Sequence, residues 1–121
     1  MLRQVTGVSH QSSRALLAFM PELGTLNRRE IAALAGLAPF DHDSGNKKGK
    51  RFIQGGRARV RSTLHMAAVS ASRFNKVLAP VYRKLRAAGK PFKVAVTAIT
   101  RKLLVHLNSL MADFLKKQVA A

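Results

Sequence analysis

The chain has 121 residues and is strongly basic, with 22 Lys and Arg against 5 Asp and Glu and a formal net charge of +17. This charge is typical of proteins that bind nucleic acid, and the 47% hydrophobic content excludes a disordered basic tail. The absence of Cys excludes disulfides, thiolate zinc sites and cysteine nucleophiles. No apolar run reaches the ~20 residues of a membrane span, and no signal-peptide core is found. We therefore expect one cytoplasmic domain, associated with the nucleoid and without a membrane partner.

The first part of the chain shows two short helical patterns. An apolar stretch over residues 11–20 predicts a helix that stops at Pro21, because proline cannot continue a helix interior. Asn27 and Glu30 have the spacing of a capping box, in which each side chain accepts a hydrogen bond from the other residue's backbone. The box predicts a second helix that starts after Asn27 and ends at Gly36.

The second part predicts three longer helices. The helix that follows Gly56 has an apolar stripe and a basic stripe on another side; these are Val60, Leu64, Ala67 and Ala71, and Arg57, Arg61 and His65. The next helix, over residues 78–88, is predicted to be disturbed near Pro80 and closed by Gly89. Pro91 then suits the first turn of the longest helix, whose apolar positions are Phe92, Val96, Ile99, Leu103, Leu107, Leu110 and Phe114. The predicted fold is mainly α, a compact helical domain with a long C-terminal helix.

A long glycine-rich loop, GLAPFDHDSGNKKGKRFIQGG, lies between the predicted helices over residues 36–56. From Ser44 to Ala112, 69 residues carry 16 Lys or Arg and no acid. Loops of this length are usually functional or disordered, and the glycines that permit tight turns here are Gly45, Gly49, Gly55 and Gly56. Ser44 has two interpretations: a hydroxyl placed for phosphoryl chemistry, or a turn serine that supports Gly45 through a local hydrogen bond.

The cations around this loop are predicted to contact phosphate. They are Lys47, Lys48, Lys50 and Arg51 in the loop and Arg57 and Arg61 in the helix that follows. The unpaired N–H groups and the dipole at the start of that helix also attract anions. Because the chain has 6 Phe, 1 Tyr and no Trp, contact with the nucleic-acid backbone is favoured over base stacking.

Two further sequence motifs do not match their patterns in spacing or in residue type. The run from Gly45 to Arg51 has one residue too few for a Walker phosphate loop and lacks its Ser or Thr. Asp41 and Asp43 resemble the start of a calcium loop, but Phe52 occupies the position of the bidentate Glu. A solvated turn is the favoured interpretation of residues 41–43, and we expect no metal site and no bound cofactor in this chain.

Four blocks of sequence carry a family resemblance. In order, they are ELGTLNRREIAALAGLAPF, DSG, KKGKRFIQGGRARVRSTLHMAA and VYRKLRAAGKPFKVAVTAITRKLLVHLN. Together they resemble the C-terminal transposase domain of the DEDD insertion-sequence transposases, the IS-one-ten group of bridge-RNA-guided recombinases. The resemblance covers nearly the whole chain, and several blocks in the right order make it specific.

The resemblance implies a two-part DNA recombinase. An N-terminal RuvC-like domain would carry an acidic site for magnesium, and the present domain would supply a serine that attacks DNA phosphate. The family's Ser-Gly element falls on Ser44 and Gly45. Lys47, Lys48, Lys50 and the neighbouring arginines would then hold DNA or guide RNA. The partners implied are DNA, a guide RNA, a RuvC-like domain in cis or in trans, and further copies of the chain.

Two departures from the family pattern shape this expectation. The chain matches the family from its interdomain helix-hairpin-helix segment onward, so we expect a truncated transposase in which residues 1–24 are a remnant of that segment and residues 25–121 form the serine-bearing domain. It is expected to be inactive alone. Ser9 also stands where relatives have glycine in the hairpin, which we expect to weaken the approach of that backbone to phosphate. The alternative function is a small basic DNA- or RNA-binding structural protein of the ribosomal or nucleoid type.

Overall fold

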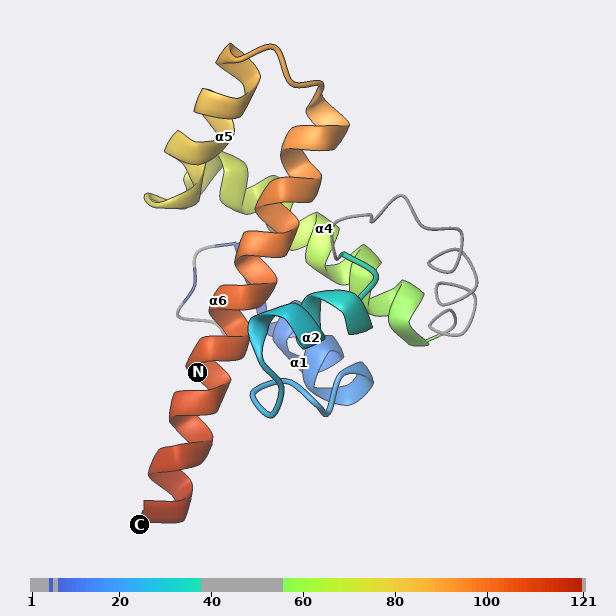
Figure 1. The fold of residues 1–121 in the computed structure, drawn as a ribbon, viewed down its shortest axis with the longest axis vertical. Helices are drawn as coiled ribbons and strands as arrows, with labels where there is room; N and C mark the ends of the chain where they lie inside the picture. Colours follow the sequence, from blue (N-terminus) through green and yellow to red (C-terminus); the bar gives the residue numbers. More distant parts are fainter. Residues whose placement is uncertain (1–4, 6, 38–55, 121) are drawn as a thin grey trace.

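The computed structural model describes residue 5 and residues 7–37 and 56–120 of the chain (Figure 1). Within these residues the chain forms helices only: α1 (His10–Phe19), α2 (Arg28–Leu34), α4 (Gly56–Phe74), α5 (Leu78–Ala87) and α6 (Phe92–Ala120). The prediction of a mainly α fold with a long C-terminal helix is confirmed. None of these helices is long and apolar enough to cross a membrane.

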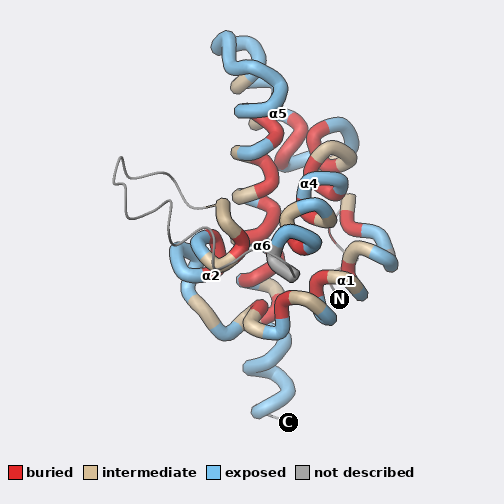
Figure 2. Tube along the Cα trace, turned by 90° about the vertical axis from the view of Figure 1, so that its right-hand side faces the viewer, coloured by how far each residue is buried: buried red, intermediate tan, exposed pale blue. Residues whose placement is uncertain are grey.

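Helix α6 is the axis of the molecule. It has 29 residues; α2, α4 and α5 pack against it, with α5 near one end, α4 crossing it and α2 lower down, and α1 packs on α4 (Figure 1). The core between α4 and α6 is formed by fully buried side chains such as Leu64, Ile99, Leu103 and Leu107. The C-terminal end of α6, residues 113–119, is exposed and projects beyond the body (Figure 2).

The segment before α1 packs tightly against α4. Val5 and Val8 are buried in the common core, and Gly7 has a positive φ of 109°. A Cβ at Gly7 would lie 2.8 Å from the backbone oxygen of Ala67, so the glycine is needed for close packing of this turn on α4. Gly7 thus lets the backbone of this turn lie close to helix α4.

Ser9 is the N-cap of α1. Its Oγ accepts a hydrogen bond from the backbone N–H of Ser12 at 3.1 Å, which satisfies one of the free donors in the first helical turn. Helix α1 begins at His10 and ends at Phe19, each one residue earlier than in the predicted range of residues 11–20, and Met20 is the C-cap. The sequence prediction had treated Ser9 only as a replacement for a hairpin glycine, and the structure gives it a capping role.

The capping box predicted at α2 is confirmed. Asn27 Oδ1 accepts from the Glu30 N–H at 2.8 Å, and Glu30 Oε1 accepts from the Asn27 N–H at 3.1 Å. Helix α2 ends at Leu34, two residues before the predicted end. Its buried residues Ile31 and Ala32 belong to the face that packs toward α6.

Asn108 ties the start of α2 to α6. This side chain is 6% exposed; its Nδ2 donates to the Leu26 backbone oxygen at 2.9 Å, and its Oδ1 accepts from the Gly24 N–H at 2.7 Å. Both bonds join residues more than 80 positions apart in the sequence. We call this pair of bonds the Asn108 latch, because it fixes the turn from which α2 starts.

Two details of the predicted helices were wrong. Helix α5 is continuous from Leu78, and Pro80 lies in its first turn, where a proline removes no intrahelical N–H bond. Phe92 and Phe114, the two ends of the predicted apolar stripe, are 49% and 39% exposed, since α6 extends past the helices that cover it.

Candidate nucleic-acid interface

Most of the predicted site residues lie outside the described part of the chain. Segment 38–55 contains the predicted nucleophile, the loop cations and three loop glycines, which are Ser44, Lys47, Lys48, Lys50, Arg51, Gly45, Gly49 and Gly55. Their roles stay predictions. Gly56, predicted as the last residue of the loop, is the first residue of α4; Arg57 follows in its first turn, and Arg61 is the predicted phosphate contact whose side chain is described.

Arg61 lines a recess at the place where the chain enters and leaves segment 38–55. The recess has a volume of about 430 Å³ and is lined by Leu37, Ala58, Arg61, Ser62, His65, Thr97 and Thr100. Leu37 is the last described residue before the segment, and Ala58 lies two residues into α4. Arg61 and His65 share this recess, as their i, i+4 spacing predicted. Described residues on either side of segment 38–55, Leu37 and Ala58, therefore line the same recess as Arg61.

A second recess brings together cations from two helices. It lies between the first turn of α2 and the middle of α6 and has a volume of about 670 Å³. Its polar lining is Arg28, Arg29, Arg101, Lys102, His106 and Ser109, and Ala98 and Val105 complete it. We call it the α2–α6 groove.

Of the described residues that line the α2–α6 groove, none is an Asp or a Glu. Glu30, the acid nearest to it in α2, uses its side chain in the capping box. Among the residues that the structure describes, Arg28, Arg29, Arg101 and Lys102 form no ion pair with an acid. Uncompensated cations that share one recess create a positive potential that attracts anions.

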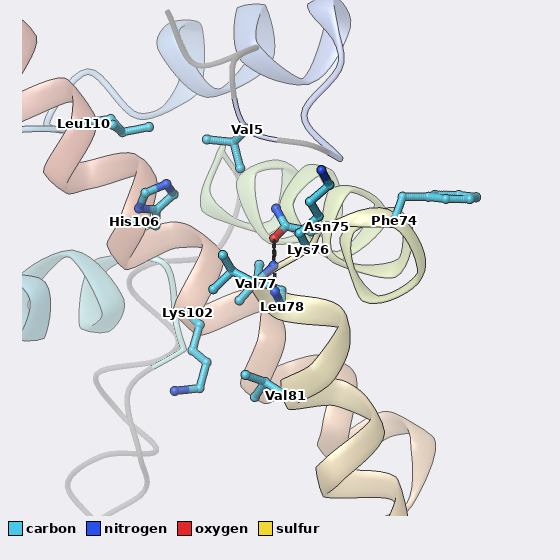
Figure 3. A pocket seen from close by; sticks show the side chains of 10 residues that line it. All are labelled: Val5, Phe74, Asn75, Lys76, Val77, Leu78, Val81, Lys102, His106 and Leu110. Carbon is cyan, nitrogen blue, oxygen red and sulfur yellow. Dashed lines mark hydrogen bonds between the residues drawn. The ribbon is translucent and has the colours of Figure 1, made fainter.

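An apolar pocket lies on the other side of Lys102 and His106 (Figure 3). It is lined mainly by apolar side chains of the α4–α5 turn and of α6, including Val77, Leu78 and Leu110. The turn is held by Asn75, whose Oδ1 accepts from the backbone N–H groups of Val77 at 2.9 Å and Leu78 at 3.0 Å. Lys102 and His106 thus form the boundary between the charged groove and this apolar pocket.

The acids that the structure describes do not gather into a metal site. Glu30 caps α2, Asp113 lies on the exposed end of α6, and no three His, Asp or Glu in the described residues are close enough to share a metal ion.

The α2–α6 groove was not predicted, although the sequence of α6 carries a signal for it. Ala98, Arg101, Lys102, Val105, His106 and Ser109 recur at steps of three and four, which puts them on one face of the helix. Their pairing with Arg28 and Arg29 depends on tertiary packing and has no local signal.

Comparison with known proteins gives one family match. The family model described as "Transposase IS116/IS110/IS902 family" matches residues 1–83, which is 83 of the 121 residues. No curated protein and no solved structure gives a significant match. The match extends from the segment before α1 through α2 and α4 into α5, so it includes segment 38–55 and the α2 side of the groove. The chain belongs to the Transposase IS116/IS110/IS902 family.

Proposed function

We propose that this chain is the serine-bearing domain of a DNA transposase and that Ser44 is its nucleophile. The observation that carries the proposal is the Ser44-Gly45 element, which opens a 69-residue stretch without acids in a chain of this transposase family. The recess beside Arg61 and His65 supports it, because it is also lined by Leu37, which directly precedes the segment that contains Ser44, and by Ala58, three residues after that segment.

In the proposed reaction, Ser44 Oγ attacks a DNA phosphorus atom and loses its proton. The phosphorus–oxygen bond to one deoxyribose breaks, and the leaving oxygen takes up a proton, so that a phosphoserine ester joins protein and DNA. A serine hydroxyl is a weak nucleophile near neutral pH and needs activation. The activating groups are proposed to belong to a RuvC-like domain that acts in cis or in trans, as part of an assembly of several copies.

The loop cations are proposed to hold the DNA and neutralise the charge that develops on the phosphate. These are Lys47, Lys48, Lys50 and Arg51, together with Arg57 and Arg61 in α4. A guide RNA bound to the same surface is part of this proposal. DNA binding itself does not require the nucleophile, so it should be independent of Ser44.

The test is a denaturing gel with labelled DNA that carries the element ends. Alone, the chain should bind this DNA without forming an adduct. With a cognate RuvC-like domain, magnesium and the guide RNA, it should form an adduct that survives denaturation. Ser44→Ala should abolish the adduct and keep the affinity for DNA. An adduct of equal yield in Ser44→Ala would refute the assignment and would favour a role as a basic binding protein.

A further inference from the structure

The α2–α6 groove is built by tertiary structure. Arg28 and Arg29 come from the first turn of α2, and Arg101 and Lys102 come from α6, more than 70 residues later. The Asn108 latch and the buried residues Ile31 and Ala32 hold the two helices together. Bringing like charges together is unfavourable in the free protein, and a bound anion would offset this repulsion.

The size of the groove suits a polyanion. From Arg101 to Ser109, α6 rises by about 12 Å. Over the same length, B-DNA presents on the order of seven phosphate charges. Four cations from two helices can therefore meet several phosphates at once, while Ser109 and His106 offer hydrogen-bonding groups on the same helix face.

The side chains of the groove favour a duplex over a single strand. No Phe or Tyr stands among the described residues that line the groove, so these residues offer unstacked bases no aromatic surface. Arginine, lysine, serine and histidine are instead the side chains that contact the outer phosphates of a double helix.

We infer that the α2–α6 groove binds the phosphate backbone of duplex DNA, as a second contact surface beside the segment that contains Ser44. Helix α2 connects the two surfaces, since the groove lies at its start and Leu37 follows its end. Its seven residues span about 10 Å, a length that one duplex covers between the groove and Leu37, the last described residue before that segment. The choice of DNA rests on the proposed function, whereas the binding site rests on the geometry of the groove.

The test compares two triple variants of the full chain that lose the same charge. Arg28→Ala/Arg29→Ala/Arg101→Ala removes three groove cations, and Arg83→Ala/Lys84→Ala/Lys90→Ala removes three exposed cations on and after α5, away from the groove. The dissociation constant for a labelled duplex is measured between about 50 mM and about 200 mM salt. The slope of log affinity against log salt should fall by about 0.9 for each phosphate that the groove variant no longer binds, and much less in the control.

Equal slopes for the two variants, or no change in either, would overturn the inference. A melting curve checks the fold of each variant, and Arg101→Gln/Lys102→Gln gives a second groove variant without changes near the capping box. Single-stranded DNA and duplex RNA of the same length serve as competitors. The inference would also be overturned if the groove variant kept its affinity for duplex DNA and lost affinity only for single-stranded DNA or only for duplex RNA. Repeating the assay in Ser44→Ala keeps the result separate from the nucleophile, because that variant should give the same slopes.

Discussion

Asn108 is the residue on which the position of α2 depends most directly. It is buried on a helix whose neighbouring positions 104 and 107 are fully buried leucines, and it bonds two backbone groups of the turn 24–26. Among the described residues, every buried side-chain nitrogen or oxygen has a partner. This satisfied polar contact fixes which part of α6 faces Arg28 and Arg29.

Replacing Asn108 by alanine should cost about 1 to 3 kcal/mol of folding free energy, because two backbone groups lose their partner in a part-buried place. Urea denaturation measures the change. The exposed neighbour Ser109 gives the matched control, and Ser109→Ala should stay within about 0.5 kcal/mol of the parent. Equal costs for the two variants would show that the latch does not stabilise the fold.

Gly24 and Gly89 allow the effect of packing to be separated from that of backbone strain. Their φ angles are nearly equal, at 89° and 88°. A Cβ at Gly24 would lie 2.6 Å from Met111 Cγ and 3.0 Å from the Ala112 nitrogen, whereas a Cβ at Gly89 would meet nothing within 4 Å. Gly89→Ala should cost about 1 to 2 kcal/mol from strain alone. Gly24→Ala should cost about 1 to 3 kcal/mol more from overlap. Thermal melts of the two variants test this order, and a more stable Gly24→Ala would contradict it.

At the scale of helices, apolar periodicity and capping signals predicted most of the fold. Val60, Leu64, Val96 and Ile99 are buried as their spacing predicts, because a helix places every third or fourth side chain on one face. The sequence could not show where the helices that cover α6 end, and so the predicted apolar stripe extends to Phe114, which is partly exposed. It also could not show the groove, since Arg28 meets Arg101 only through packing. The prediction for Ser44 depended on family resemblance and lies outside the described residues.

Leu103 tests the core of α6. It is fully buried, so Leu103→Ala should cost about 2 to 5 kcal/mol through reduced burial and a cavity. Phe114→Ala should cost much less because Phe114 is 39% exposed, and Ser44→Ala should leave the melting temperature nearly unchanged. Melting curves of the three variants decide the order. A large destabilisation in Ser44→Ala with little in Leu103→Ala would favour a structural turn role for the serine.

At the scale of the whole molecule, the main feature is the large positive net charge. The net charge of +17 is carried on a small domain, and four of its cations share the α2–α6 groove, while Arg61 lines a separate recess. Such a field attracts nucleic acid at long range, and salt screens it. Binding to DNA should therefore be steeply salt-dependent.

The loop cations should contribute their own share of this dependence. Replacing Lys47, Lys48, Lys50 and Arg51 by alanine should flatten the slope of log affinity against log salt by about 0.9 for each phosphate that is no longer neutralised. Combined with the groove variant, the reduction in slope should be close to additive, because cations that bind different phosphates release different counterions. An unchanged slope in a salt titration would remove the loop from the binding surface.

The central claim is that Ser44 becomes bonded to DNA phosphate, and the most direct measurement is the identity of the bonded residue. The adduct formed with the RuvC-like domain, magnesium, guide RNA and element ends would be digested with nuclease and protease, and the peptide that keeps a nucleotide would be sequenced by mass spectrometry. The account predicts a nucleotide-phosphate mass on Ser44 in the peptide that contains Asp43 and Gly45. A nucleotide on any other residue, such as Ser62 beside Arg61, would contradict it.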